Sequence, residues 1–175
     1  VRSAEGVQGK SLCLDYDFNG VSGYVDIQRD LPMTYPEHYR FSFRLRGDSP
    51  DNDLQFKLVD ASGDNVWWVN RPRYDYPRQW TPVRYKRRHI DKAWGPDPDP
   101  VLHKSAKLEF TIYNNAGGRG SVGFDSLAFT PLAPDDDGPL VATALATAGD
   151  AQAAVDGRMA TQWRAANTAV PQRLV

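Results

Sequence analysis

The chain has 175 residues, enough for one domain with a sizeable core, and its content of 41% hydrophobic and 25% charged residues is that of an ordinary globular protein. Its 13 prolines, 14 glycines and many aromatic residues favour strands and loops over helices. The formal net charge of −1 supplies no overall field that would recruit nucleic acid or an anionic membrane. Any charged partner would have to be bound by a local patch.

The lack of a second cysteine and of a long apolar run narrows the class of protein further. Cys13 is the only cysteine, which excludes an internal disulfide framework and leaves the redox compartment open. No run of about 18 apolar residues occurs, so the sequence predicts no membrane span. The chain begins without methionine and without the pattern of a signal peptide, and we expect it to be a piece of a longer protein.

About eight segments in the first 132 residues alternate apolar and polar side chains, as half-buried strands do. They are residues 11–18, 24–31, 39–47, 54–60, 65–73, 80–88, 107–114 and 121–132. This pattern predicts an all-β fold, an antiparallel β-sandwich of jelly-roll type, for residues 1–132. The proline-rich run 71–78 is expected at a sheet edge, and residues 89–102 are expected to form a long loop with Trp94 near its tip.

The composition changes after residue 132. Residues 133–139 contain proline, glycine and consecutive aspartates, Asp135 to Asp137, and are predicted to be a linker. Residues 140–175 are alanine-rich and lack alternation, and the pair Asp156-Gly157 interrupts the stretch that could otherwise be a helix. The last segment is too short to form an independent core.

Two adjacent tryptophans, Trp67 and Trp68, lie in the middle of one predicted strand. Because strand side chains alternate, one ring faces the core and the other faces outward, and the flanking residues do not decide which. Each is therefore a candidate aromatic platform beside Asn70 and Arg71, since an apolar ring face next to planar polar groups suits a sugar. The alternative is that both rings are buried, one of them under a loop.

Other strand faces that point away from the predicted core carry polar side chains, among them Gln55 and Glu109. We expect a neutral or acidic glycan to bind without any chemical step, so that the module holds a neighbouring catalytic domain near its substrate. The candidate carbohydrate-binding residues are Trp67, Trp68, Asn70, Arg71, Lys57, Arg44 and Trp94.

A basic stripe, Arg84, Lys86 and Arg88, follows one face of the strand at residues 80–88. Such a stripe could follow the phosphates of single-stranded nucleic acid, bind an acidic polysaccharide, or be solvated surface beside acidic neighbours. The low net charge argues against nucleic acid, and we expect no nucleic-acid partner.

The sequence offers no recognisable catalytic arrangement. The three histidines lack metal-ligand spacing, and no nucleophile elbow, CxxC pair or phosphate-binding glycine loop is found. We therefore expect no catalytic residues and no enzymatic activity in this chain.

Three stretches, GKSLCLDYDF, YRFSFRLRG and GSVGFDSLAF, resemble the jelly-roll carbohydrate-binding modules of bacterial polysaccharide-degrading enzymes and the related galactose-binding-like domains. The resemblance implies a non-catalytic accessory module of a larger polysaccharide-active protein, such as a glycoside hydrolase. It implies a poly- or oligosaccharide partner and a periplasmic or extracellular location. In that group a final-strand aspartate often ligates structural calcium, which implies Asp125 as a metal ligand.

The tail string AAVDGRMATQW resembles the opening of a discoidin domain, the coagulation factor 5/8 type C family. The matching positions are Ala154, Val155, Asp156, Gly157, Thr161 and Trp163. The resemblance implies that 140–175 is the truncated first part of such a domain, with Asp156 and Thr161 as candidate metal ligands. It also implies other domains of the same polypeptide as partners. The alternative function is a structural or interaction domain without a ligand, packing against the rest of a multidomain enzyme.

Overall fold

The computed structural model describes residues 1–134, 141–143, 150–157 and 163–164. The chain divides into two compact units, Val1–Ala133 and Pro134–Val175, and each is described by itself.

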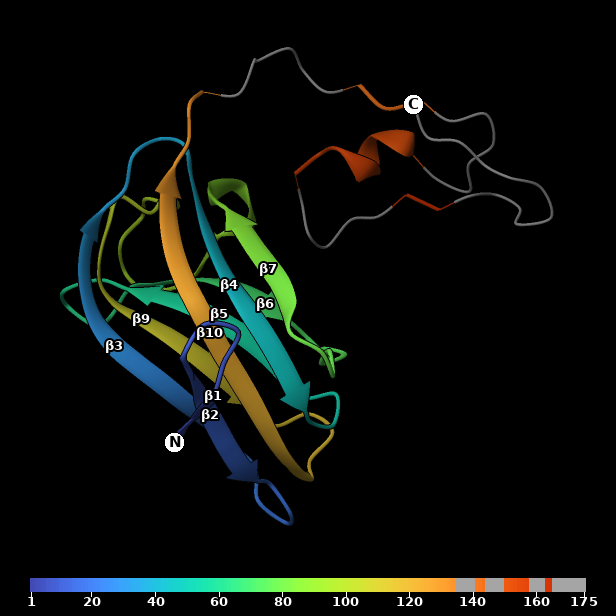
Figure 1. Cartoon of the computed structure of the whole chain (residues 1–175). Coiled ribbons are helices and arrows are strands. Elements are labelled where there is room, and N and C mark those ends of the chain that lie inside the picture. Colours follow the sequence, from blue (N-terminus) through green and yellow to red (C-terminus); the bar gives the residue numbers. More distant parts are fainter. Residues whose placement is uncertain (135–140, 144–149, 158–162, 165–175) are drawn as a thin grey trace. The chain divides into compact units, whose positions relative to one another are not determined.

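The first unit is an antiparallel sandwich of two five-stranded sheets (Figure 1). Sheet A runs in the order β1 (Arg2–Glu5), β2 (Lys10–Asp17), β10 (Arg119–Pro131), β4 (Tyr39–Asp48) and β7 (Thr81–Lys86). Sheet B runs in the order β3 (Tyr24–Thr34), β9 (Lys104–Tyr113), β5 (Asp53–Val59), β6 (Val66–Arg71) and β8 (Asp91–Trp94). The predicted fold class, an antiparallel β-sandwich, is confirmed.

Two short strands, β1 and β8, were not predicted. Each has four residues, too few to show a period of two in the sequence. Each forms by pairing with a longer neighbour, β1 with β2 and β8 with β6. The expectation of a continuous loop over 89–102 was therefore wrong, since Trp94 ends strand β8, which a single 3₁₀ turn, η1 (Arg87–His89), precedes.

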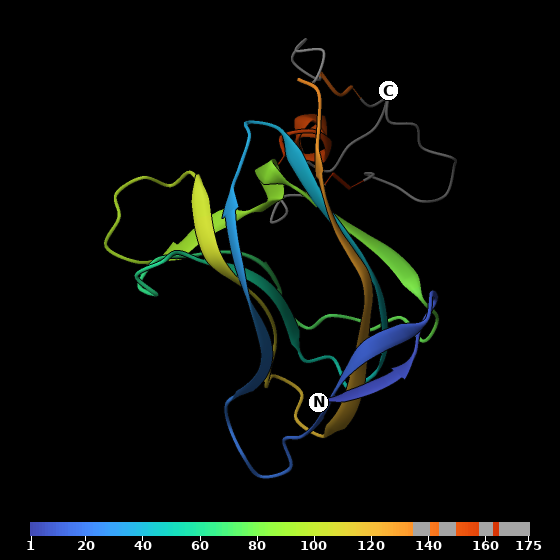
Figure 2. The same cartoon turned by 60° about the vertical axis from the view of Figure 1, so that its left-hand side comes forward.

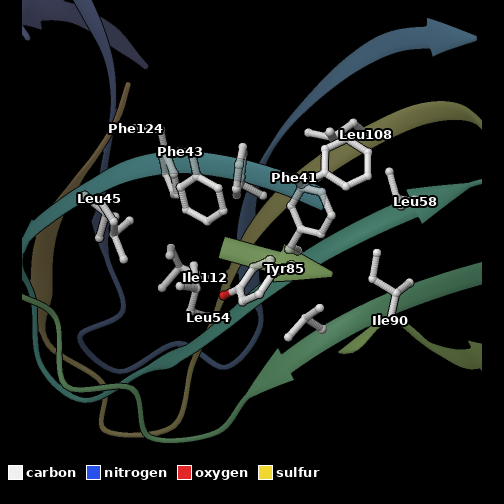
Figure 3. Close-up of a cluster of buried hydrophobic side chains, with 14 of the residues drawn as sticks. Phe41, Phe43, Leu45, Leu54, Leu58, Tyr85, Ile90, Leu108, Ile112 and Phe124 are labelled. Atoms are coloured by element: carbon white, nitrogen blue, oxygen red, sulfur yellow. The ribbon is translucent and has the colours of Figure 1, made fainter. Parts of the chain in front are cut away.

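The two sheets face each other (Figure 2). The core between them is rich in aromatic rings. Phe43 of β4 and Phe124 of β10 meet Phe110 of β9, with ring centroids 4.9 Å and 4.3 Å from that of Phe110. Figure 3 shows Phe41, Phe43 and Phe124 of sheet A in one cluster with the sheet B residues Leu54, Leu58, Leu108 and Ile112. Burying one such side chain contributes about 1.5–3 kcal/mol. These residues fix which side of each strand faces inward.

Trp67 belongs to this core and is only 3% exposed. Its indole Nε1 donates a hydrogen bond of 2.9 Å to the carbonyl oxygen of Pro100, which satisfies the polar edge of the ring. Alternation along β6 consequently turns Trp68 outward.

The described part of the second unit contains one 3₁₀ turn, η2 (Ala151–Ala154). The backbone amide of Gln152 donates a hydrogen bond of 2.9 Å to the Asp150 carboxylate, which caps the start of the turn. Gly157 follows with a φ of +77°, a conformation that glycine adopts easily. The turn thus ends before the Asp156-Gly157 pair. None of the helical turns in the described ranges has the length and apolarity needed to cross a bilayer.

Candidate functional site

The outer face of sheet B brings polar and aromatic side chains from five strands together; we call it the sheet B face. The register sets Gln28, Glu109, Lys57 and Trp68 in one row across β3, β9, β5 and β6. The adjacent row consists of Asp26, Thr111, Gln55 and Asn70. Because the alternate residues of the same strands fill the core, both rows point outward.

Aromatic rings border these rows. Tyr24 is 60% exposed, Tyr113 45% and Trp94 49%. Trp68 is half-buried and packs edge to face against Trp94, with the ring centroids 5.5 Å apart and the planes at 85°. The rings come from the edge strands β3 and β8 as well as from β6 and β9, so they lie on opposite sides of the polar rows.

Lys57 lies at the centre of the face. Its ammonium is 5.5 Å from the ring centroid of Tyr24 on β3 and 5.8 Å from that of Trp94 on β8. The rings from both edge strands therefore lean over the central strands of the face. The residues of the floor are buried accordingly, with 9% of Lys57 exposed and Gln55 and Thr111 more deeply covered.

The floor holds polar groups that lack partners. Burial lowers the pKa of the Lys57 ammonium, and the carboxylates of Glu109 and Asp26 oppose that shift only in part. The buried Oδ1 of Asn70 and Oγ1 of Thr111 have no hydrogen-bond partner among the described residues. An unmade hydrogen bond at a buried polar atom costs about 1–3 kcal/mol. Both atoms are covered, so a ligand rich in hydroxyl groups could supply their partners only where the side chains above them move aside.

The structure brings together four of the candidate residues named from the sequence: Lys57, Trp68, Asn70 and Trp94. The other three lie elsewhere, since Trp67 is in the core and Arg44 is on sheet A. The third, Arg71, ends β6 with its guanidinium 5.4 Å over the ring of Tyr74.

Sequence reasoning missed two rings of the sheet B face, Tyr24 and Tyr113. Both occupy the polar side of an alternating segment, a position where a large aromatic residue is unusual. An aromatic residue at such a position was the sequence signal that could have identified Tyr24 and Tyr113 as exposed rings. The pairing of Tyr24 with Tyr113 across β3 and β9 depends on strands far apart in the chain and could not be obtained from local pattern.

Asp125 lies at the β-bulge of β10 and forms hydrogen bonds with the turn between β1 and β2. Its Oδ2 accepts hydrogen bonds from the backbone amides of Val7 at 2.6 Å and Gln8 at 3.3 Å, and its Oδ1 accepts from the hydroxyl of Ser126. Calcium needs several converging oxygen ligands. The groups around Asp125 are hydrogen-bond donors and do not fit that ion.

The other expected metal ligands are not gathered either. Within the described ranges no three acidic, histidine or cysteine side chains lie close enough to hold a metal ion. Asp156 is exposed in the second unit, and Thr161 lies outside the described residues. Calcium binding by Asp156 and Thr161 stays a prediction from the family resemblance.

No protein-family model matches the sequence, and none of the curated proteins is significantly similar to it. Solved structures do resemble it. The family 11 carbohydrate-binding module of a cellulosomal cellulase of Clostridium thermocellum has a TM-score of 0.57 at 14% identity, over 77% of this chain and 82% of that chain. The family 11 module of the same organism in complex with a β-1,3-1,4-mixed-linked tetrasaccharide has a TM-score of 0.56 at 15% identity, over 72% and 78%.

An exo-β-agarase also contains a similar region, with a TM-score of 0.52 at 14% identity. The match covers 78% of this chain but only 22% of the agarase. At these identities the comparisons establish that the first unit has the β-sandwich fold of carbohydrate-binding modules.

Proposed function

We propose that the first unit is a non-catalytic carbohydrate-binding module that holds a poly- or oligosaccharide on the sheet B face. The observation that carries the proposal is the buried polar floor around Lys57, lying between exposed rings from both edges of the sheet. One of the similar structures holds a mixed-linked tetrasaccharide, which supports the same ligand class here.

Binding would use the two kinds of group for different parts of a sugar. Tyr24, Tyr113 and Trp94 are exposed and can cover the apolar C–H face of a pyranose ring, and the apolar surface buried in such a contact contributes about 25 cal/mol per Å². The Lys57 ammonium and the amides of Gln55 and Asn70 can bond hydroxyl groups, and charge-assisted hydrogen bonds are the stronger ones. No bond is made or broken.

The module would then act by proximity. A carbohydrate-binding unit tethered to a catalytic domain raises the effective concentration of that domain at its substrate. We propose that this chain belongs to such a multidomain, polysaccharide-active protein and works where polysaccharides occur, in the periplasm or outside the cell. The resemblance of residues 153–163 to a discoidin opening and the division of the chain after Ala133 support further domains as its partners.

The test is a titration of the 175-residue chain with soluble polysaccharides, followed by tryptophan fluorescence. The panel contains a mixed-linked β-1,3-1,4-glucan, cellulose-derived oligosaccharides and agarose oligosaccharides. We expect a saturable change with one of them that Trp94→Ala or Tyr24→Ala weakens.

Trp80→Ala is the matched control, because this ring lies against Gly123 on the other sheet and its removal leaves the sheet B face intact. Binding that survives both sheet B variants, or is lost in the control alone, contradicts the proposal. No response to the whole panel would favour a structural domain without a ligand.

A further inference from the structure

The part of the outer face of sheet A that β4 and β7 form is basic, in contrast to the low net charge of the chain. The aspartates elsewhere on this face, Asp15, Asp17 and Asp48, pair with Arg2, Arg119 and Arg78. Inward positions of β4 and β7 are occupied by core residues such as Phe41, Phe43 and Tyr85. The outward positions of the two strands hold mainly cations, and we call this set the sheet A face: Arg40, Arg44, Arg46, Arg84 and Lys86. Arg40 lies opposite Lys86, and Arg84 lies opposite Ser42 between Arg40 and Arg44.

These arginines are poorly neutralised. Among the described residues, Arg40, Arg44 and Arg84 form no ion pair, and the buried Nε of Arg40 has no hydrogen-bond partner. Asp125 lies opposite Arg44 in the register, but its Oδ2 accepts from the Val7 and Gln8 amides. Arg84 lies diagonally from Arg40 and Arg44 across β4 and β7, and like charges on adjacent strands repel, so an anion bound among these three arginines would relieve their repulsion.

A polar hollow of about 330 Å³ continues the sheet A face at the Arg46 end of β4. Its lining comprises Arg2, Cys13, Arg46, Gly47, Asp48, Arg78, Ser121 and Gly123. The ring of Trp80 lies so close over Gly123 that a Cβ there would be 2.9 Å from it, and the Arg46 guanidinium covers the ring at 4.8 Å. Arg2 and Arg78 in this lining pair with Asp15 and Asp48, so Arg46 is the guanidinium of the hollow that stands over a floor of small residues without a carboxylate partner among the described residues.

We propose that the sheet A face is a second glycan-binding surface, which takes an acidic polysaccharide bearing carboxylate or sulfate groups. The planar guanidinium group pairs with such anions through two parallel hydrogen bonds. Alternate residues of a strand lie about 7 Å apart, so Arg44 and Arg46 can meet successive charged groups of one extended polymer.

The lack of accessible rings separates this ligand from single-stranded nucleic acid. Proteins that bind such strands stack successive bases on exposed aromatic side chains. Among the described residues, Trp80 is the aromatic side chain on the sheet A face, and Arg46 already covers it. A ligand recognised by its charges alone fits the surface better.

The experiment is affinity electrophoresis of the whole chain through gels containing polygalacturonate, dextran sulfate or neutral dextran. We expect polygalacturonate or dextran sulfate, but not dextran, to retard the protein, and the stronger of the two identifies the anion. Retardation should fade as salt rises from about 0.1 M to about 1 M, since the Debye length falls from about 10 Å to about 3 Å. The double variant Arg44→Gln/Arg84→Gln should bind about tenfold more weakly.

The control Arg29→Gln/Lys104→Gln removes the same charge from exposed positions of β3 and β9. Equal weakening in the two double variants would show a general charge effect and overturn the proposal. So would the absence of retardation by either acidic polymer at low salt, or tighter binding of a single-stranded DNA oligonucleotide. Binding of a neutral glycan to the sheet B face should be unchanged in both double variants, so the two proposals fail separately.

Discussion

The two outer faces of the sandwich each belong to a five-stranded antiparallel sheet and share one core, yet their chemistry differs. The sheet B face places amides and one buried lysine between aromatic rings. The sheet A face places arginines along β4 and β7, and its one ring lies under Arg46. The inward residues determine the fold, whereas the outward residues of the same strands are free to differ. A shared fold therefore identifies neither ligand, and the side chains of each face must be considered on their own.

The largest effect is expected from a substitution in the shared core, which should weaken binding at both outer faces at once. Phe43 contacts the rings of Phe56, Tyr85, Phe110 and Phe124 across the core. Phe43→Ala should lower the free energy of unfolding by about 3–5 kcal/mol, measured in urea, and weaken both glycan activities in parallel. If one face kept its full affinity while the other lost it, the shared core would not support them jointly.

Substitutions of the adjacent Trp67 and Trp68 test which side of β6 faces the core. Trp67→Ala should cost about 3–5 kcal/mol of stability, because the ring is buried and hydrogen-bonded to Pro100. Trp68→Ala should lower the stability clearly less than Trp67→Ala does, and it should weaken neutral-glycan binding by about tenfold. Unfolding curves and titrations of the two variants, run side by side, check this, and an equal loss of stability would refute the assignment of the two sides of β6.

Alkaline pH should affect the two faces together through the core. Burial raises the pKa of the hydroxyls of Tyr39, Tyr76 and Tyr85, none of which has a hydrogen-bond partner among the described residues. The unfolded chain loses these protons near pH 10, so the stability is fully present below that value and is lost as the pH rises toward the raised pKa values. Each tyrosine should contribute a slope of about 1.4 kcal/mol per pH unit.

Thermal melts at increasing alkaline pH measure that slope. Tyr85→Phe should reduce the slope of stability against pH by the contribution of one tyrosine. An unchanged slope would mean that Tyr85 ionises normally in the folded protein.

The smallest expected effect belongs to Lys57. Because burial lowers its pKa, the folded chain holds this proton less tightly than the unfolded chain does, and stability should rise as the pH passes from the lowered value to the ordinary one. Lys57→Met should remove this rise and stabilise the protein at neutral pH by about 1 kcal/mol or less. Lys107→Met, on the neighbouring strand β9, is the control for the loss of a lysine and should not stabilise the protein.

The long strands could be predicted from the sequence, but the set of residues that each outer face brings together could not. Alternation identified β4 and β5 because their inward residues are uniformly apolar. It could not orient Trp67 and Trp68, since a bond to Pro100, 33 residues away, helps to fix that side. Lys57 and Arg44 looked alike as outward polar residues, and only strand order placed them on different sheets.

The most direct test of the central claim is an NMR titration of the indole N–H signals with the glycan that the fluorescence panel selects. The sheet B assignment predicts saturable shifts at Trp68 and Trp94, while the signals of Trp67, held in the core, and Trp80, under Arg46, remain in place. Shifts at Trp80 without shifts at Trp68 and Trp94 would contradict the claim that neutral sugars bind the sheet B face.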